Sequence, residues 1–217
     1  MAPPDSDPSD DDQARALPPG LWAKLREDPV HAPEHLALAA AERHAPAAEA
    51  WVAEKRRRYD MTPHDLATAA KRRHASLSRV SGAATGVGGF LTVVPDLAAA
   101  AWVQSRCVFF IAAAFGYDPH DRMRPAELLV LQGLYDSVED ARRALDGTGR
   151  SVAQSMLSKG MSREETLARR LARMVGRRAA KRIGARLIPG LAIALNAVGN
   201  ERDTRELADR AIRFYGG

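Results

Sequence analysis

Apolar residues recur along this chain with the three-to-four-residue spacing of amphipathic helices, and no segment alternates apolar and polar residues as a half-buried strand would. Proline, glycine and capping residues divide the pattern into helices. Ser162 with Glu165, for example, forms an S-x-x-E capping box at the start of a long helix. The expected helices cover residues 21–26, 33–44, 46–60, 63–95, 96–115, 125–135, 137–147, 162–188 and 190–215, with a further short helix that begins at Ser151. The fold class that we predict is an all-α, multi-helix bundle.

Two Val/Ile-Pro positions predict that the bundle contains two proline-broken helical hairpins. Pro95 and Pro189 lie 94 residues apart, and the same offset brings several further identical residues into register. Self-similarity at a fixed offset is a sign of internal repetition. Our hypothesis is an internal duplication, with half-repeats of roughly 63–116 and 162–216.

The glycine-rich stretch at residues 81–102 carries no phosphate-binding motif. A P-loop needs G-x-x-x-x-G-K-[ST], but no lysine occurs between Lys71 and Lys159. A dinucleotide fingerprint needs a third glycine where this chain has Leu91. Glycines four residues apart place small residues on one helix face, which lets another helix approach closely. The residues that we assign to helix packing and hinges are Gly82, Gly86, Pro95, Pro189 and Gly190.

The same region raises the question of a membrane hairpin, because residues 80–117 hold only two charges, Asp96 and Arg106. The first arm, the 15 residues from Val80 to Val94, would be roughly 22 Å long, too short for the ~30 Å hydrocarbon core of a bilayer. In the second arm, Arg106 would lie mid-bilayer at a cost of about 2.5–3.5 kcal/mol. A buried core hairpin is therefore favoured over a spanning pair, and shallow insertion of hairpin 80–115 at a membrane surface stays open.

Composition divides the chain into an acidic tail and a basic body. Residues 1–19 are proline-rich and hold five aspartates, so we expect a disordered acidic tail. The first 16 residues carry a formal charge of −4, which leaves +9 on the rest of a chain whose total is +5. Hydrophobic residues make up 46% of the chain but aromatic residues only 6%, which favours closely packed helices over a sheet. We expect residues 20–217 to form a single helical domain.

The helix expected at residues 162–188 is basic on one side and apolar on the other. Arginine and lysine recur in two neighbouring rows, while Leu167, Leu171 and Ile183 follow the opposite side. Such a helix can lie on anionic lipid, where each basic residue adds about 1 kcal/mol, but it can also neutralise nucleic-acid phosphates or face solvent. No zinc module or aromatic stacking platform indicates sequence-specific nucleic-acid binding. The candidate lipid- or anion-binding residues are Arg169, Arg170, Arg173, Arg177, Arg178, Lys181 and Arg182.

Polar residues interrupt the apolar segment that follows Pro95. A buried arginine must be paired, so we expect Arg106 to meet a carboxylate from another helix, such as Glu201 or Asp203. The candidate buried polar cluster is Asp96, Gln104, Arg106, Asn200 and Glu201. The functional alternative to a structural cluster is a polar pocket for a lipid headgroup or a small anion.

The sequence contains few signs of catalysis or metal binding. His31 and His35 share one helix face, but Pro33 lies between them and no third metal ligand is evident. No G-x-S-x-G, H-E-x-x-H or C-x-x-C sequence occurs. The single Cys107 stands among apolar residues, which indicates a small buried side chain in a reducing compartment. We therefore name no catalytic residue, metal ligand or cofactor, and expect a protein without enzymatic activity.

Three segments together resemble the EcsC family of bacterial proteins: GAATGVGGFLTVVPDLAAAAWVQSRCVFFIAAAFGYDP, AELLVLQGLY and KRIGARLIPGLAIALNAVGNERDTRELADRAIRFYG. The resemblance covers about residues 20–217. It implies a bacterial cytoplasmic protein near a membrane process and assigns no catalytic residues. The residues that match the family pattern include Gly82, Gly86, Pro95, Asp96, Gly116, Pro189, Gly190, Asn200 and Ala211.

The basic helix and the resemblance lead to one main hypothesis of function. The chain is expected to be a non-enzymatic accessory protein in the cytoplasm that associates peripherally with the inner face of a membrane. Its expected partner is an anionic membrane surface or a membrane protein complex. Two alternatives stay open: a soluble protein-interaction or self-assembly module, and a non-specific nucleic-acid binder.

Overall fold

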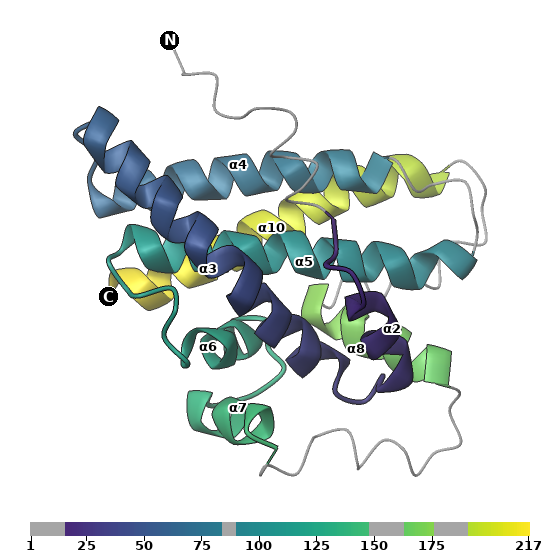
Figure 1. Cartoon of the computed structure of the whole chain (residues 1–217). Helices are drawn as coiled ribbons and strands as arrows, with labels where there is room; N and C mark the ends of the chain where they lie inside the picture. Colours follow the sequence, from purple (N-terminus) through teal and green to yellow (C-terminus); the bar gives the residue numbers. More distant parts are fainter. Residues whose placement is uncertain (1–15, 84–89, 148–162, 176–190) are drawn as a thin grey trace.

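The computed structural model describes residues 16–83, 90–147, 163–175 and 191–217. Within these ranges the chain forms eight α-helices and no strand (Figure 1). The prediction of an all-α, multi-helix bundle is therefore confirmed. The helices are α2 (Leu21–Glu27), α3 (Ala32–Arg58), α4 (Pro63–Ala83), α5 (Phe90–Ala114), α6 (Arg124–Leu131), α7 (Val138–Leu145), α8 (Arg163–Val175) and α10 (Leu191–Gly216).

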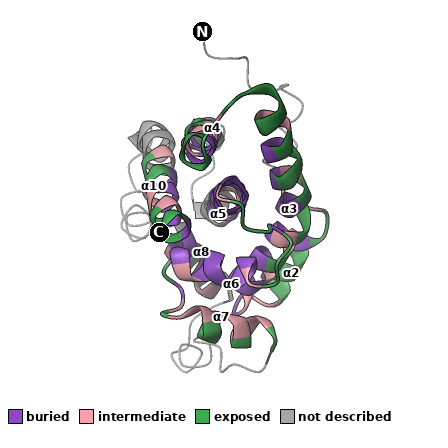
Figure 2. Cartoon of the chain, turned by 90° about the vertical axis from the view of Figure 1, so that its left-hand side faces the viewer, coloured by how far each residue is buried: buried purple, intermediate pink, exposed green. Residues whose placement is uncertain are grey.

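The apolar helix α5 occupies the centre of the bundle. Seen along its axis, α5 is surrounded by α3, α4, α10, α8 and α6 (Figure 2). Trp102, Phe109 and Phe110 are each no more than 1% exposed, and burial of one such side chain stabilises a fold by about 1.5–3 kcal/mol. Within the described residues, Leu97–Ala114 is the one stretch long and apolar enough to cross a membrane, and 94% of it is buried inside the protein.

Two long helices, α4 and α10, pack along α5 and against each other. The chain runs antiparallel in α4 and α5 (Figure 1). Lys71 of α4 forms an ion pair with Asp209 of α10, and the hydroxyl oxygens of Ser78 and Thr204 lie 2.8 Å apart. These polar contacts fix the register between the two helices.

Capping residues set several helix ends where the sequence predicts them. Thr62 and Asp65 form a reciprocal capping box at the start of α4, with both backbone N–H to side-chain oxygen distances at 3.2 Å. At the end of α5, Gly116 has a φ of +88°, and the amides of Gly116 and Tyr117 donate to the carbonyls of Ala113 and Ala112. This is a Schellman motif, which requires a left-handed residue after the helix. At the start of α7, the Ser137 side chain accepts from the backbone amide of Asp140, 3.1 Å away.

Three predicted helix boundaries are wrong. Helix α3 runs through Pro46 without ending, because the carbonyl that loses its partner belongs to Glu42, at an exposed position that water can reach. Helix α5 likewise runs through Pro95, so Pro95 is not the predicted hinge. Pro95 is the sixth residue of α5, where the single backbone bond that it removes lies next to the helix end. Helix α6 stops at Leu131, before the predicted Tyr135, because Gly133 takes a φ of +72°.

The predicted half-repeats do not pack as two separate hairpins. Helix α10 packs mainly on α4 and α5, and α8 packs mainly on α5 and α3. The helices of the second predicted half-repeat, α8 and α10, therefore pack on the central helix of the first half-repeat, α5. The internal duplication stays a prediction. Gly82 lies in the last turn of α4, whereas Gly86, Pro189 and Gly190 lie outside the described residues, as does most of the predicted acidic tail. The end of that predicted tail belongs to the fold, because Leu17 packs against the core.

A buried polar group fixes the C-terminal end of α10 to α6. The Tyr215 hydroxyl donates to Glu127 at 2.6 Å, and Glu127 also forms an ion pair with the buried Arg124. The Arg124 guanidinium lies over the rings of Tyr117 and Tyr215. Burial, and next the charge of Glu127, raise the pKa of Tyr215 well above its ordinary value, so the hydroxyl keeps its proton.

Substitution Tyr215→Phe tests this contact. It removes a hydrogen bond to a buried charged acceptor, and we expect the free energy of unfolding to fall by about 1.5–3 kcal/mol in urea titrations. Tyr117→Phe is the matched control, because the Tyr117 ring contacts Tyr215 but its hydroxyl has no partner among the described residues. Equal stability of the two variants would contradict the assigned role of the Tyr215 hydroxyl.

Candidate functional site

Helix α8 buries one side against the bundle, and that side includes a charged residue. Leu167, Leu171 and Met174 are no more than 3% exposed, as expected for the apolar side of the helix. Arg170 is also buried, at 5% exposure. The prediction that Arg170 binds lipid is therefore wrong, because positions 167, 170, 171 and 174 share the inward face of a 3.6-residue helix.

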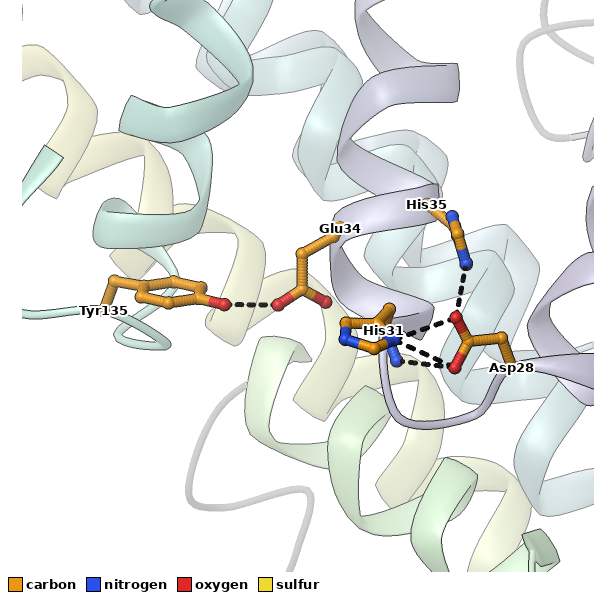
Figure 3. A network of polar contacts seen from close by, with 5 residues as sticks. All are labelled: Asp28, His31, Glu34, His35 and Tyr135. Atoms are coloured by element: carbon orange, nitrogen blue, oxygen red, sulfur yellow. Dashed lines mark hydrogen bonds and ion pairs between the residues drawn. The ribbon is translucent and has the colours of Figure 1, made fainter. Parts of the chain in front are cut away.

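The charge of Arg170 lies near a buried carboxylate on α3. Glu34 is 4% exposed, and its Oε1 accepts a hydrogen bond from the hydroxyl of Tyr135, which follows α6 (Figure 3). Burial lowers the pKa of Arg170, and the negative charge of Glu34 opposes this effect. Burial, followed by the contact with Glu34, raises the pKa of Tyr135. This network holds α3, α8 and the segment after α6 together.

The two histidines that share a helix face lie beside Glu34, at the start of α3 (Figure 3). Asp28 Oδ2 lies 2.9 Å from His31 Nδ1 and 3.0 Å from His35 Nε2. Burial by itself would raise the pKa of Asp28, but the hydrogen bonds from His35 and His31 outweigh it and hold this pKa below its ordinary value. Asp28 is thus an anion at the positive N-terminal end of α3.

Asp28 is the third group that sequence reasoning did not find beside His31 and His35. The arrangement is closed, because both imidazoles contact the same carboxylate oxygen. Among the described residues, no group of three or more His, Cys, Asp or Glu side chains has the geometry to hold a metal ion. We therefore assign Asp28 a structural role: it holds His31 and His35 at the start of α3, and its Oδ1 also accepts from the backbone amide of His31 at 3.3 Å.

The structure does not describe the whole of the predicted buried polar cluster. Gln104 and Arg106 are 1% and 6% exposed in the middle of α5, whereas the side chains of Asp96 and Asn200 lie outside the described residues. Glu201 forms an ion pair at 2.8 Å with Arg205 of its own helix. The proposed pairing of Arg106 with a carboxylate of α10 stays a prediction.

The surroundings of Arg106 include an aromatic ring and two buried histidines. Its guanidinium is 4.8 Å from the centroid of Phe110, whose ring also meets His74 of α4 at 4.8 Å. His44 of α3 lies against Trp102, with ring centroids 4.3 Å apart. Sequence reasoning missed both histidines. A signal was available in the sequence: His44 and His74 each share a helix face with alanines, and these alanines are buried.

Both core histidines are held neutral. Burial and then the charge of Arg106 lower the pKa of His44 well below its ordinary value. For His74, burial is the main cause and lowers the pKa from 6.5 to about 3. His74 Nδ1 lies 2.8 Å from the carbonyl oxygen of Ala70, so this nitrogen carries the proton and donates it. Two neutral imidazoles thus lie near the buried charge of Arg106.

Comparison with known proteins finds a family model that matches most of the chain, but not α2 or the start of α3. A family model described as the EcsC protein family matches residues 41–216. The matched range contains His44, His74 and Arg106 but begins after Asp28 and Glu34. No curated protein and no solved structure matches the chain.

The buried state of His74 predicts a stability that depends on pH. Below pH 6.5 the unfolded chain binds a proton at this imidazole and the folded chain does not, so the free energy of unfolding falls as the pH falls towards 3. This one group contributes up to about 1.4 kcal/mol per pH unit. We expect His74→Phe to flatten the loss of stability between pH 6 and pH 5, as measured by urea unfolding.

His64→Gln serves as the control for this experiment, because His64 is exposed at the start of α4. It should leave the pH dependence unchanged. If His74→Phe and the unmodified protein lose stability equally between pH 6 and pH 5, His74 is not a buried neutral imidazole.

Proposed function

The chain belongs to the EcsC protein family, and from this premise we propose that it is a non-enzymatic accessory protein that associates peripherally with an anionic membrane surface. Its place in the cell would be the cytoplasm, at the inner face of the membrane. The partner would be the lipid itself or a membrane protein complex.

The position of α8 supports this proposal most directly. Its apolar side is used inside the bundle, against α5 and α3. Arg173 lies outside the fully buried face of α8 and is half-buried. In the sequence, Arg169, Arg177 and Lys181 stand at four-residue steps from Arg173, and Arg177 and Lys181 lie outside the described residues. We propose that the predicted helix 162–188 presents this row of cations to anionic headgroups while the apolar side of α8 stays in the core.

The burial of α5 favours a peripheral contact over a spanning one. Its apolar stretch already has protein neighbours on all sides, and crossing a membrane would require these contacts to be broken (Figure 2). The rest of the predicted hairpin 80–115 lies partly outside the described residues. The proposal therefore uses charge at the surface and leaves α5 in the core.

Flotation with lipid vesicles tests the proposal. We expect the purified protein to bind vesicles that contain phosphatidylglycerol and not vesicles of phosphatidylcholine alone, and to be released at high salt because exposed charges are screened. Reversing Arg169 and Arg173 to Glu should weaken binding at least about tenfold, since each basic residue near an anionic surface adds about 1 kcal/mol.

The matched control reverses two exposed arginines elsewhere, Arg26→Glu with Arg72→Glu, which changes the net charge equally. Circular dichroism confirms that all variants fold. Equal weakening by both pairs would show that α8 is not the contact. Absence of binding under every condition would contradict membrane association and leave a soluble interaction module as the better account.

A further inference from the structure

One end of the bundle brings together the ends of four helices. Here α3, α5 and α10 finish and α4 begins (Figure 1). Arg56 at the end of α3 donates to the carbonyl of Ala114 at 3.3 Å. The ring of Phe115 meets His64 of α4 and packs so closely on Gly216 of α10 that an added Cβ would lie 3.1 Å from it. We call this surface the aromatic end.

Exposed aromatic side chains concentrate at the aromatic end. Among the described residues only four large hydrophobic side chains are exposed, and three of them, Tyr59, Tyr117 and Phe214, stand here. Their exposed fractions are 39%, 44% and 44%, and the fourth, Leu38, stands in the first half of α3. Tyr117 and Phe214 both pack on Tyr215, and two exposed rings on one support indicate a contact surface. Tyr59 stands where α3 finishes, at the same end of the bundle.

The aromatic side chains of this end are held in fixed positions. Tyr215 lies between Tyr117 and Phe214, with ring centroids 5.1 Å and 5.0 Å from theirs. The hydroxyl of Tyr215 is bound to Glu127 within the core. Tyr117 and Phe214 therefore project from a rigid support, and little conformational entropy is lost when they are covered.

Two arginines that neighbour these aromatic residues in the chain are without an ion pair among the described residues. They are Arg57 and Arg213, and both are exposed. Three carboxylates near this end have partners of their own: Glu54 pairs with Arg58, Asp65 caps α4, and Asp118 accepts from the amide of His120 at 2.8 Å. Asp60, next to Tyr59, is exposed and offsets one of the positive charges. Within the described residues, the aromatic end thus combines amphipathic rings with exposed guanidinium groups.

We propose that the aromatic end enters the headgroup region of an anionic lipid bilayer. This inference rests on the proposed membrane association and adds the surface that inserts. Tyrosine rings prefer the membrane–water interface, and a guanidinium binds phosphate through two parallel hydrogen bonds. Exposed charges attract an anionic surface over the screening length of about 8 Å, whereas the rings of the aromatic end act only on contact.

The single cysteine of the chain makes a direct test practical. Cys107 is fully buried, and burial raises the pKa of its thiol to about 12, so it resists labelling in the folded protein. A Phe214→Cys variant can then carry an environment-sensitive fluorophore at the aromatic end. Ser76→Cys, at an exposed position on α4, carries the same label as the control.

We expect the label at position 214 to shift its emission to the blue with phosphatidylglycerol vesicles and not with phosphatidylcholine vesicles. The label at position 76 should not shift. Spin-labelled headgroups should quench the label at 214 and not the one at 76.

A variant series without labels gives a second readout. Tyr59→Ser, Tyr117→Ser and Phe214→Ser combined should weaken binding to anionic vesicles roughly tenfold or more, because three partly exposed rings lose their lipid contact. Leu38→Ser is the matched control, since Leu38 is 38% exposed elsewhere on the molecule and should change binding little.

The outcomes separate this inference from the proposed function. The inference would be overturned if the protein bound anionic vesicles while the emission of the label at 214 did not shift and the triple serine variant bound as tightly as the unmodified protein. The contact would then be α8. A blue shift that grows with protein concentration in the absence of lipid would also overturn it, because the surface would then join two copies of the chain. Failure of the unmodified protein to bind anionic vesicles would refute both.

Discussion

The enclosure of α5 is the constraint on which the rest of the structure depends. A helix that is apolar on every side cannot face water on any side, so other helices have to surround it. Those helices, α3, α4, α6, α8 and α10, each supply a face of small or apolar side chains. Their outer faces are left for charge. The basic character of the surface and the apolar character of the centre are two results of one arrangement.

Polar groups inside the bundle follow from the same enclosure. Arg106 is buried on α5, where its guanidinium lies over the ring of Phe110 and its charge acts on the neutral imidazoles of His44 and His74. Glu34 and Arg170 are one layer further out, between α3 and α8. Removing charged groups from water is costly, so these positions restrict how the helices pack more than they add to stability.

Local signals were enough to predict many helix ends but not the long-range contacts. Thr62, Gly116 and Ser137 act through neighbours within a few residues, and each sets a boundary where the sequence predicts one. Proline received too much weight as a sign of a helix end. Tertiary packing keeps α3 and α5 each continuous, although the proline inside each helix removes one backbone hydrogen bond. Helical spacing identified α8 as amphipathic but placed Arg170 on the wrong side of the boundary between its two faces.

The candidate site was harder to predict because its residues come from distant parts of the chain. Tyr135 is 101 residues from Glu34, and Tyr215 is 88 residues from Glu127. Nothing in the local pattern distinguishes these tyrosines from exposed ones such as Tyr59. The aromatic end is a further case, since Tyr59, Tyr117 and Phe214 share a surface only because α3, α5 and α10 finish together.

Hydrogen exchange of the backbone amides of Leu97–Ala114, with and without phosphatidylglycerol vesicles, tests the central claim most directly. If α5 is the core of a peripheral protein, these amides stay protected to the same degree while the protein is bound to lipid. Loss of their protection on lipid binding, while α3 and α10 remain protected, would contradict the account. The central helix would then leave the bundle to enter the membrane.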